Sequence, residues 1–242
     1  MESAWKDNVL RNFDACAKTY EDYADIQSHV AKKLAGYLPD LEHPDILEIG
    51  CGTGLFTRQL ARKYKGGSFV ITDISPHMVK QAQEKTKGTN MHWTVMDGDH
   101  PVCTGAYDLI AANMAFQWFE DIHTALGKLS KTLKPQGVIF YSVPGPFCFR
   151  EWRIALNRLG LRAGTHDFKI PPGLFAQERI TMRYSSALDF LRSIKNMGAG
   201  TEKSPRRPLS CGEMREACRV FDDIFEGRMT WHILYGCTRG RV

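Results

Sequence analysis

A glycine-rich turn directly after an apolar strand constrains this chain more than any other feature. The run EIGCGTG occupies residues 48–54, and its first glycine directly follows the strand-like segment 45–49. Glycine permits a tight turn and a close approach of a ligand to the backbone, and the N-terminus of the following helix presents donors to the same crevice. In an open α/β sheet such a crevice lies at the carboxyl ends of the strands. The turn therefore predicts a ligand site at one edge of a parallel sheet.

Apolar segments around this turn alternate between strand and helix periodicity, which indicates a doubly wound, Rossmann-like α/β fold. The expected strands are 45–49, 68–73, 91–96, 107–113 and 138–143. The expected helices between them are 55–64, 76–85 and 122–133. The last of these helices has the clearest spacing, with apolar residues at i, i+3, i+4, i+7 and i+11. It should end where Pro135 follows Lys134.

The segments on either side of this core look mainly helical. Residues 3–38 predict two helices, and residues 147–200 look mostly helical, with strand-like segments near 180–184 and 229–237. Residues 200–208 are the best candidate for a mobile loop. We expect one domain with four parts, which are a helical lid (1–40), a cofactor-binding core (41–146), a mostly helical substrate and carrier region forming an insertion after the fifth strand (147–228) and a final strand (229–242).

Composition excludes several classes of protein. The 242 residues are 43% hydrophobic and 24% charged, which excludes collagen, coiled coils and wholly disordered chains. No apolar run approaches the roughly 18 residues of a membrane span, and the N-terminus lacks a secretory signal. Seven cysteines without a CxxC pair predict reduced thiols in a cytoplasmic protein. Eight histidines without HxH or HExxH spacing give no reason to expect a metal site.

Positive charge is concentrated in the last third of the chain. Residues 1–146 carry 15 Lys/Arg and 17 Asp/Glu, whereas residues 147–242 carry 17 and 10. Such an asymmetry can steer an acidic partner toward one end of the molecule, although an ordinary solvated surface explains it equally well.

The spacing around the glycine turn decides between two nucleotide-binding classes. Asp73 ends the second strand, 23 residues after Gly50, where a carboxylate can accept both hydroxyls of a ribose. A nicotinamide dehydrogenase would have GxGxxG, but its third glycine would fall on Leu55. The GxGxG spacing after Glu48 instead resembles the first motif of class I S-adenosylmethionine-dependent methyltransferases.

Two later segments agree with this resemblance. Asp97 and Gly98 follow the third strand, where that superfamily places an acid against the adenine amino group. Asn113 ends the fourth strand, where the superfamily reaches the methionine part of the cofactor and the methyl group that is transferred.

Segments outside the glycine turn resemble a narrower family. Residues 13–27, FDACAKTYEDYADIQ, look like the N-terminal signature of malonyl-[acyl-carrier-protein] O-methyltransferases, with Cys16 at a usual alanine. Further similar segments are 73–78, 113–118, 188–199 and 230–236. The resemblance implies methyl transfer from S-adenosylmethionine to the free carboxylate of a malonyl thioester. The carrier would be an acidic acyl carrier protein or coenzyme A, and the methyl ester would prime pimeloyl and biotin synthesis. No nucleic-acid or membrane partner is expected.

The resemblance also assigns roles to residues. By this resemblance, the residues of this chain that bind the cofactor would be Gln27, Glu48, Gly50, Cys51, Gly52, Asp73, Ile74, Met78, Asp97, Gly98 and Asn113. The substrate carboxylate would be positioned by Tyr20, Trp118 and Lys195, with Arg150, Arg192 and His166 as further candidates. The carrier protein would dock on some of Arg150, Arg153, Arg158, Arg162, Arg206 and Arg207.

The N-terminal segment has a helical spacing of its own. Phe13, Ala17, Tyr20, Ala24 and Gln27 fall on one stripe if a single helix runs through them. The stripe is either a packing face or a lid that closes over the cofactor with Tyr20 toward the methyl-transfer site.

Two other functions remain open for the whole chain. One is a methyltransferase of this fold acting on another small acid or a quinone precursor, and the other is a non-catalytic cofactor-binding assembly factor.

Overall fold

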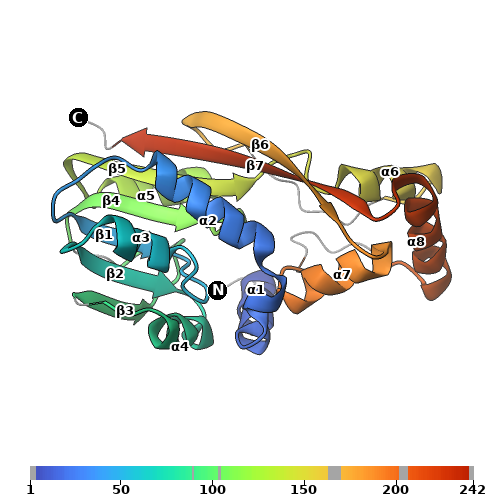
Figure 1. Ribbon diagram of the computed structural model, residues 1–242, viewed down its shortest axis with the longest axis horizontal. Coiled ribbons are helices and arrows are strands. Elements are labelled where there is room, and N and C mark those ends of the chain that lie inside the picture. The colour runs from blue at the N-terminus through green and yellow to red at the C-terminus, as the bar shows by residue number, and fades with distance from the viewer. Residues whose placement is uncertain (1–3, 89, 103–104, 163–169, 202–206, 240–242) are drawn as a thin grey trace.

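A seven-stranded sheet with the strand order β3-β2-β1-β4-β5-β7-β6 forms the centre of the protein (Figure 1). The computed structural model describes residues 4–88, 90–102, 105–162, 170–201 and 207–239. The strands are β1 (Asp45–Ile49), β2 (Ser68–Asp73), β3 (Met91–Val95), β4 (Tyr107–Asn113), β5 (Leu133–Pro144), β6 (Leu174–Arg183) and β7 (Arg228–Arg239). The first five strands run parallel to one another, and β7 runs antiparallel to both β5 and β6. The predicted doubly wound α/β class is confirmed.

Helices cover both faces of this sheet. They are α1 (Ala4–Cys16), α2 (Asp25–Tyr37), α3 (Thr57–Lys63), α4 (Pro76–Lys85), α5 (Ile122–Ser130), α6 (Arg150–Arg158), α7 (Ala187–Asn196) and α8 (Cys211–Phe225), with short 3₁₀ turns η1 (Tyr20–Tyr23) and η2 (Phe116–Trp118). In the described part of the chain, no helix combines the length and apolar character that a membrane crossing requires.

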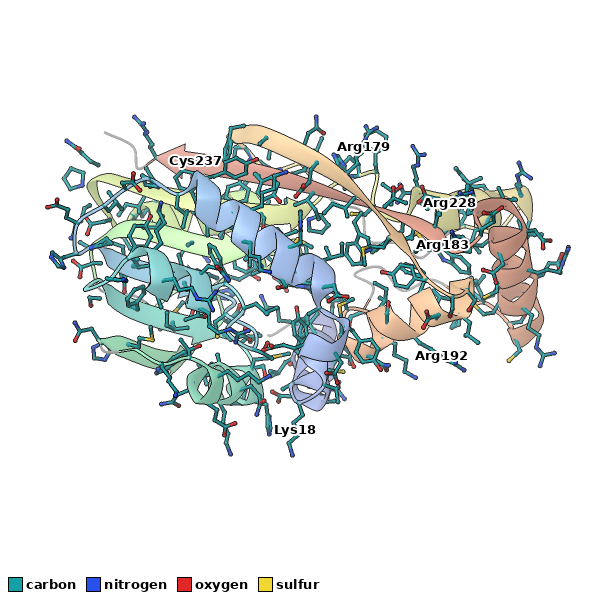
Figure 2. All side chains as sticks on the ribbon, in the orientation of Figure 1. Lys18, Arg179, Arg183, Arg192, Arg228 and Cys237 are labelled. Carbon is teal, nitrogen blue, oxygen red and sulfur yellow. The ribbon has the colours of Figure 1, made fainter. Side chains whose placement is uncertain are left out.

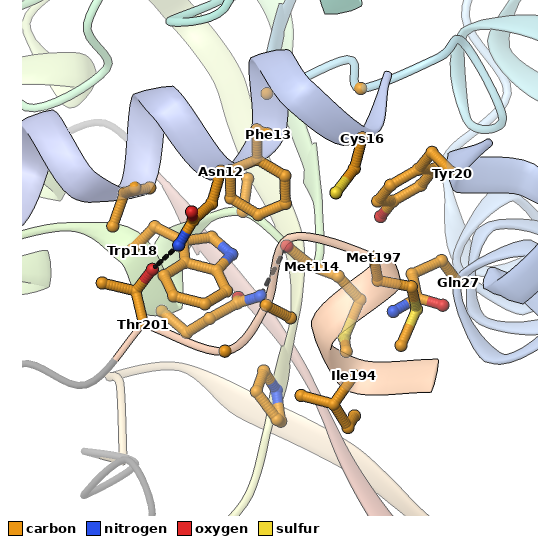
Figure 3. Close-up of a pocket in the computed structure, with 18 of the residues that line it drawn as sticks. Asn12, Phe13, Cys16, Tyr20, Gln27, Met114, Trp118, Ile194, Met197 and Thr201 are labelled. Atoms are coloured by element: carbon orange, nitrogen blue, oxygen red, sulfur yellow. Dashed lines mark hydrogen bonds between the residues drawn. The ribbon is translucent and has the colours of Figure 1, made fainter. Parts of the chain in front are cut away.

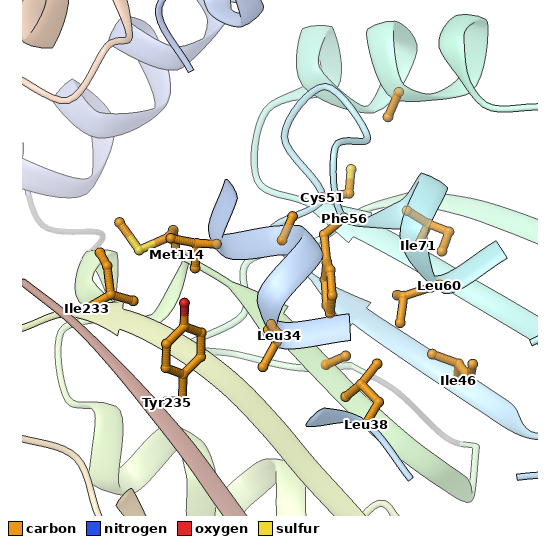
Figure 4. Packing of buried hydrophobic residues seen from close by; sticks show 14 of the residues in the cluster. Leu34, Leu38, Ile46, Cys51, Phe56, Leu60, Ile71, Met114, Ile233 and Tyr235 are labelled. Atoms are coloured by element: carbon orange, nitrogen blue, oxygen red, sulfur yellow. The ribbon is translucent and has the colours of Figure 1, made fainter. Parts of the chain in front are cut away.

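Alternating strand residues divide the core into two layers. Ile46 packs with Leu34 of α2 and Leu60 of α3 on one face, as Figure 4 shows. The next residue along β1, Leu47, packs with α5 on the other face. This alternation follows from the two-residue period of a strand and explains why the central strands are apolar on both sides.

Beyond the sheet body, α6, α7 and α8 form a third packed cluster at the far end of the β6–β7 ribbon (Figure 1). Its centre includes Trp152, Phe190 and Phe221, all buried. Helix α1 lies between this cluster and the sheet body (Figure 1). The molecule is therefore extended, and α1 borders the space between its two parts.

The predicted helix 122–133 is too long by three residues. Helix α5 ends at Ser130, and Leu133 instead begins β5 by pairing with Tyr107 of β4. The register then shifts, so that Val138 pairs with Leu109 and the intervening residues form an irregular stretch. The expected apolar strand 138–143 is thus the regular part of a longer strand, and Leu133 matched the helical spacing by coincidence.

The region 147–200 is less helical than expected. Strand β6 supplies ten residues in which exposed and partly buried positions alternate. Ile180 and Met182 pack toward the core, while Arg179 and Arg183 are exposed. The predicted strand near 180–184 overlaps only the last residues of β6. In the proposed mobile loop, residues 202–206 lie outside the described residues.

Candidate functional site

One cavity of about 920 Å³ runs along the carboxyl ends of β1, β2 and β4 and continues between α1 and α7 (Figure 3). Of the predicted cofactor residues, all except Glu48 line it. Tyr20, Trp118 and Lys195 line it as well. The fold therefore brings the glycine turn and the predicted substrate residues to a single space.

The glycine turn needs its glycines for two different reasons. Gly50, Gly52 and Gly54 have φ of +70°, +52° and +87°, in the left-handed region that side chains disfavour. A Cβ on Gly50 would lie 2.5 Å from the Cβ of Ala115, because the turn packs directly against the segment after β4. A Cβ on Gly52 would meet nothing within 4 Å. Gly50 is thus needed for packing, whereas Gly52 leaves open space in the cavity.

Asp73 ties this turn to the end of β2. One carboxylate oxygen accepts from the amide of Gly52 at 2.8 Å and the other from the amide of Ser75 at 2.9 Å. Burial raises the pKa of Asp73 to about 6, with a further increase from the charge of Asp14, although the amide donors oppose the rise. Since a carboxylate can accept about four hydrogen bonds, Asp73 retains capacity for ligand hydroxyls beside these backbone amides.

Asp97 lies at the other end of the cofactor part of the cavity. Its Oδ1 accepts from the amide of Asp99 at 3.1 Å and lies 2.7 Å from Nζ of Lys6. Burial alone would raise the pKa of Asp97, but Lys6 and the Asp99 amide outweigh burial and lower it. Asp97 is therefore an ionised acceptor, as the recognition of an amino group requires.

Gln27 and Asn113 connect the first turn of α2 to the end of β4. The Asn113 side chain donates to the backbone oxygen of Gln27 at 3.2 Å and accepts from the Ser142 hydroxyl at 2.9 Å. Oε1 of Gln27 is buried and has no hydrogen-bond partner among the residues that the structure describes, and the residue lines the cavity. A buried acceptor without a partner is costly, so this oxygen fits a ligand that brings a donor such as an ammonium group.

Glu48 is the exception among the predicted cofactor residues. It is fully buried and lies outside the cavity lining, so the structure does not bring it to the cavity with the others and its contact with the cofactor stays a prediction. Burial raises the pKa of its carboxyl to about 8, and the charge of Asp73 adds to the rise, while the nearby Thr57 hydroxyl lowers it. The raised pKa favours the neutral carboxyl over the carboxylate near pH 7 at this position, the fourth residue of β1.

The prediction that residues 13–27 form one stripe of a single helix is wrong, because the helix is interrupted there. Helix α1 ends at Cys16, Tyr20 belongs to η1, and α2 begins at Asp25. Nevertheless Phe13, Tyr20 and Gln27 all line the cavity (Figure 3). The break turns the chain around the cavity, because Ala17 and Ala24 on either side of η1 are buried in the core.

The cavity continues away from the glycine turn into a more apolar part. Trp118 stacks edge-on against Phe13 with ring centroids 5.3 Å apart. Beyond it, the lining is formed by Phe149, Trp152, Leu156, Leu191, Ile194, Leu209, Met214 and Trp231. Lys195, Arg162 and Arg207 supply positive charge along this part. Such a lining suits a largely apolar arm that carries an anionic end.

Three further substrate candidates are not on this cavity or cannot be placed. Arg150 is half-exposed and pairs with Glu151 at 3.0 Å, and Arg192 is exposed on α7, as Figure 2 shows. Neither side chain lines the cavity, so the structure does not bring these two residues together with Tyr20, Trp118 and Lys195. His166 lies outside the described residues.

Sequence reasoning missed Lys6, Asn12 and Thr201, which also line the cavity. Asn12 donates to the Thr201 hydroxyl at 2.7 Å and so joins α1 to the segment after α7. Lys6 shares a helical face with Val9 and Phe13, which follow it at i+3 and i+7. That spacing was available in the sequence, but a lysine beside an acidic N-terminus suggests a solvated side chain.

Comparison with known proteins agrees with this geometry. Residues 46–137, which contain the glycine turn, match the family model described as a methyltransferase domain. The malonyl-[acyl-carrier protein] O-methyltransferase of Magnetococcus marinus is 36% identical over 94% of this chain and 90% of its own length. The chain belongs to the malonyl-[acyl-carrier protein] O-methyltransferase family.

Other comparisons set the limits of this family assignment. The biotin biosynthesis bifunctional protein BioCD of Bordetella avium is 36% identical over 89% of this chain. The chain spans only 49% of the length of that bifunctional relative. The solved structure of the YcgJ protein from Bacillus subtilis matches with a TM-score of 0.60 at 15% identity, over 88% of this chain and 99% of that one. That likeness supports the fold alone.

Proposed function

We propose that this member of the malonyl-[acyl-carrier protein] O-methyltransferase family methylates the free carboxylate of a malonyl thioester held on an acyl carrier protein, with S-adenosylmethionine as methyl donor. The observation that carries the proposal is the 36% identity to an enzyme of that name over nine-tenths of both chains. The cavity supports it, because Asp73, Asp97 and Gln27 offer acceptors suited to a ribose, an adenine amino group and an ammonium group.

The proposed reaction needs alignment more than acid–base chemistry. When bound, S-adenosylmethionine supplies an electrophilic methyl carbon, to which the carboxylate oxygen bonds while the carbon–sulfur bond breaks and its electron pair stays on sulfur. A carboxylate is already ionised near pH 7, so the protein need not provide a general base. Holding the two reactants in line can supply about 7–11 kcal/mol of the barrier.

Tyr20 and Lys195 are the donors best placed to hold the malonyl carboxylate. Burial, followed by the charges of Asp73 and Glu21, raises the pKa of Tyr20, so its hydroxyl stays protonated and can donate. Lys195 lies in the last turn of α7 and brings a positive charge to the cavity wall. A buried carboxylate without such partners would be strongly disfavoured.

Replacing Lys195 with methionine is expected to lower kcat/KM for malonyl-carrier protein about tenfold, since one charge-assisted contact is lost. Affinity for S-adenosylhomocysteine, measured by calorimetry, should stay unchanged. Arg192→Met is the matched control, because Arg192 is an exposed cation about one turn earlier on the same helix and does not line the cavity. Equal effects of the two substitutions on kcat/KM would reject the assignment of Lys195.

The proposal includes docking of the carrier protein, with fewer candidate arginines than the sequence predicted. Arg153 donates to the carbonyls of Cys148 and Pro146, and Arg207 pairs with Glu213 at 2.6 Å. Arg158 and Arg162 are exposed, and Arg162 also borders the cavity, which makes the end of α6 the favoured docking position. Arg206 lies outside the described residues.

The remaining expectations stay part of this proposal. They are the cytoplasmic location, the division into lid, core, insertion and final strand, and the choice of carrier protein over coenzyme A. A methyltransferase for another small acid or a quinone precursor, or an assembly factor without turnover, is not favoured, because the curated relatives above carry the malonyl-specific or biotin-synthesis name.

A further inference from the structure

We infer that Lys6 is a positioning residue for cofactor recognition, which holds Asp97 in place for the adenine amino group and fastens helix α1 over the cavity. The inference rests on the proposed function, with S-adenosylmethionine as the cofactor, and adds Lys6 to the residues of the cofactor site. The observation behind it is that Lys6 contacts Asp97 and Asp99, which follow it in the sequence by 91 and 93 residues.

Lys6 sits between two carboxylates at the edge of the cavity. Its ammonium lies 2.7 Å from Oδ1 of Asp97 and also bonds Oδ2 of Asp99. The side chain is only 9% exposed, and the ammonium lies 5.3 Å from the ring centroid of Phe119. A lysine is rarely buried unless it is paired, so this pairing fixes the position of the first turns of α1.

The two acids differ in what else they contact. Asp99 is 6% exposed, accepts from the amide of Glu120 at 3.0 Å and does not line the cavity. Asp97 lines the cavity, and its side chain is 26% exposed. Lys6 therefore links a buried anchor, Asp99, to the acid that faces the ligand. Oδ1 of Asp97 is held by Lys6, whereas Oδ2 lies 3.5 Å from Nδ1 of the exposed His100, a longer contact that leaves this oxygen able to accept from a ligand amino group.

The other end of α1 is fastened near the ribose position. Asp14 accepts from the Ser75 hydroxyl and lies 3.1 Å from Nδ1 of His77. Ser75 in turn donates its amide to Asp73. The two ends of α1 are thus tied to the two loops whose acids are suited to the adenine and the ribose of one adenosine. Lys6 makes the tie at the adenine end.

Three variants of the full chain test this role. Lys6→Met should weaken binding of S-adenosylhomocysteine at least tenfold by calorimetry, and Lys6→Arg should restore most of it because the charge and the donors are kept. Lys18→Met is the matched control, since Lys18 follows α1 and is exposed away from the cavity (Figure 2). It should bind like the unchanged protein.

A second readout separates positioning from mere stability. S-inosylhomocysteine has a carbonyl in place of the adenine amino group, so an ionised, well-placed Asp97 should discriminate against it. The ratio of the two dissociation constants should fall at least threefold in Lys6→Met and stay unchanged in Lys18→Met. Hydrogen exchange of the α1 amides should also become faster in Lys6→Met.

If Lys6→Met proves unstable, Asp99→Asn offers a second route, because Asp99 touches Lys6 but not the cavity. The same loss of discrimination is expected, in smaller measure. Unchanged discrimination in folded Lys6→Met or, where that variant is unstable, in Asp99→Asn would overturn the inference. These binding measurements need no carrier protein, so failure of the proposed methyl transfer would be seen separately.

Discussion

Gly50→Ala is expected to destabilise the protein by roughly 2–5 kcal/mol and to abolish measurable cofactor binding. The added Cβ would lie 2.5 Å from the Cβ of Ala115, in a packed region, and φ of +70° disfavours any side chain. The left-handed conformation costs about 1–2 kcal/mol and overpacking about 1–3 kcal/mol. Relief requires the turn to move, which displaces the cofactor-binding backbone. Chemical denaturation and calorimetry with S-adenosylhomocysteine measure the two effects.

Two other glycines provide controls for this prediction. Gly52→Ala has the same sign of φ but meets nothing within 4 Å, so it should cost only about 1–2 kcal/mol while its methyl group weakens cofactor binding. Gly127→Ala lies within α5 with nothing within 4 Å and should be neutral or slightly stabilising. A Gly50→Ala protein as stable as Gly127→Ala would contradict the packing account of the turn.

Asp73→Ala is expected to lower cofactor affinity at least about a hundredfold. Two hydrogen bonds from ribose hydroxyls to a charged acceptor, each contributing about 1.5–3 kcal/mol, would be lost. The amides of Gly52 and Ser75 would also lose the acceptor that orders the turn. Asp40→Ala is the matched control, because the fully exposed Asp40 side chain does not line the cavity and its loss should leave cofactor affinity unchanged.

The role of Asp73 also predicts how cofactor affinity changes with pH. Because burial raises the pKa of Asp73 to about 6, the carboxylate is ionised above that pH and loses acceptor strength below it. Affinity for S-adenosylhomocysteine should therefore fall as the pH is lowered through about 6. Asp73→Asn should remove this inflection. An inflection that persists in Asp73→Asn would assign it to another group.

The sequence predicts which residues meet around the glycine turn, because local rules determine their positions. A strand, a glycine turn and an acid at the end of the next strand occupy positions that the parallel sheet itself aligns. Asp73, Asp97 and Asn113 follow three strands whose carboxyl ends meet, so their convergence needs no knowledge of side-chain packing.

Tertiary contacts decide what the sequence could not show. Glu48 has the right position in the motif, yet β1 buries its side chain beneath the turn. Lys6 looks like a surface residue until the fold places Asp97 and Asp99 beside it. Arg192 and Lys195 belong to the same helix, and only the angular position of α7 decides which of them reaches the cavity.

The most direct test of the account is mass spectrometry of malonyl-carrier protein after incubation with the purified protein and S-adenosylmethionine. The account predicts a mass gain of one methylene on the malonyl group and no gain on acetyl-carrier protein, which lacks the free carboxylate. No gain on malonyl-carrier protein, while calorimetry shows intact cofactor binding, would contradict the proposed methyl transfer.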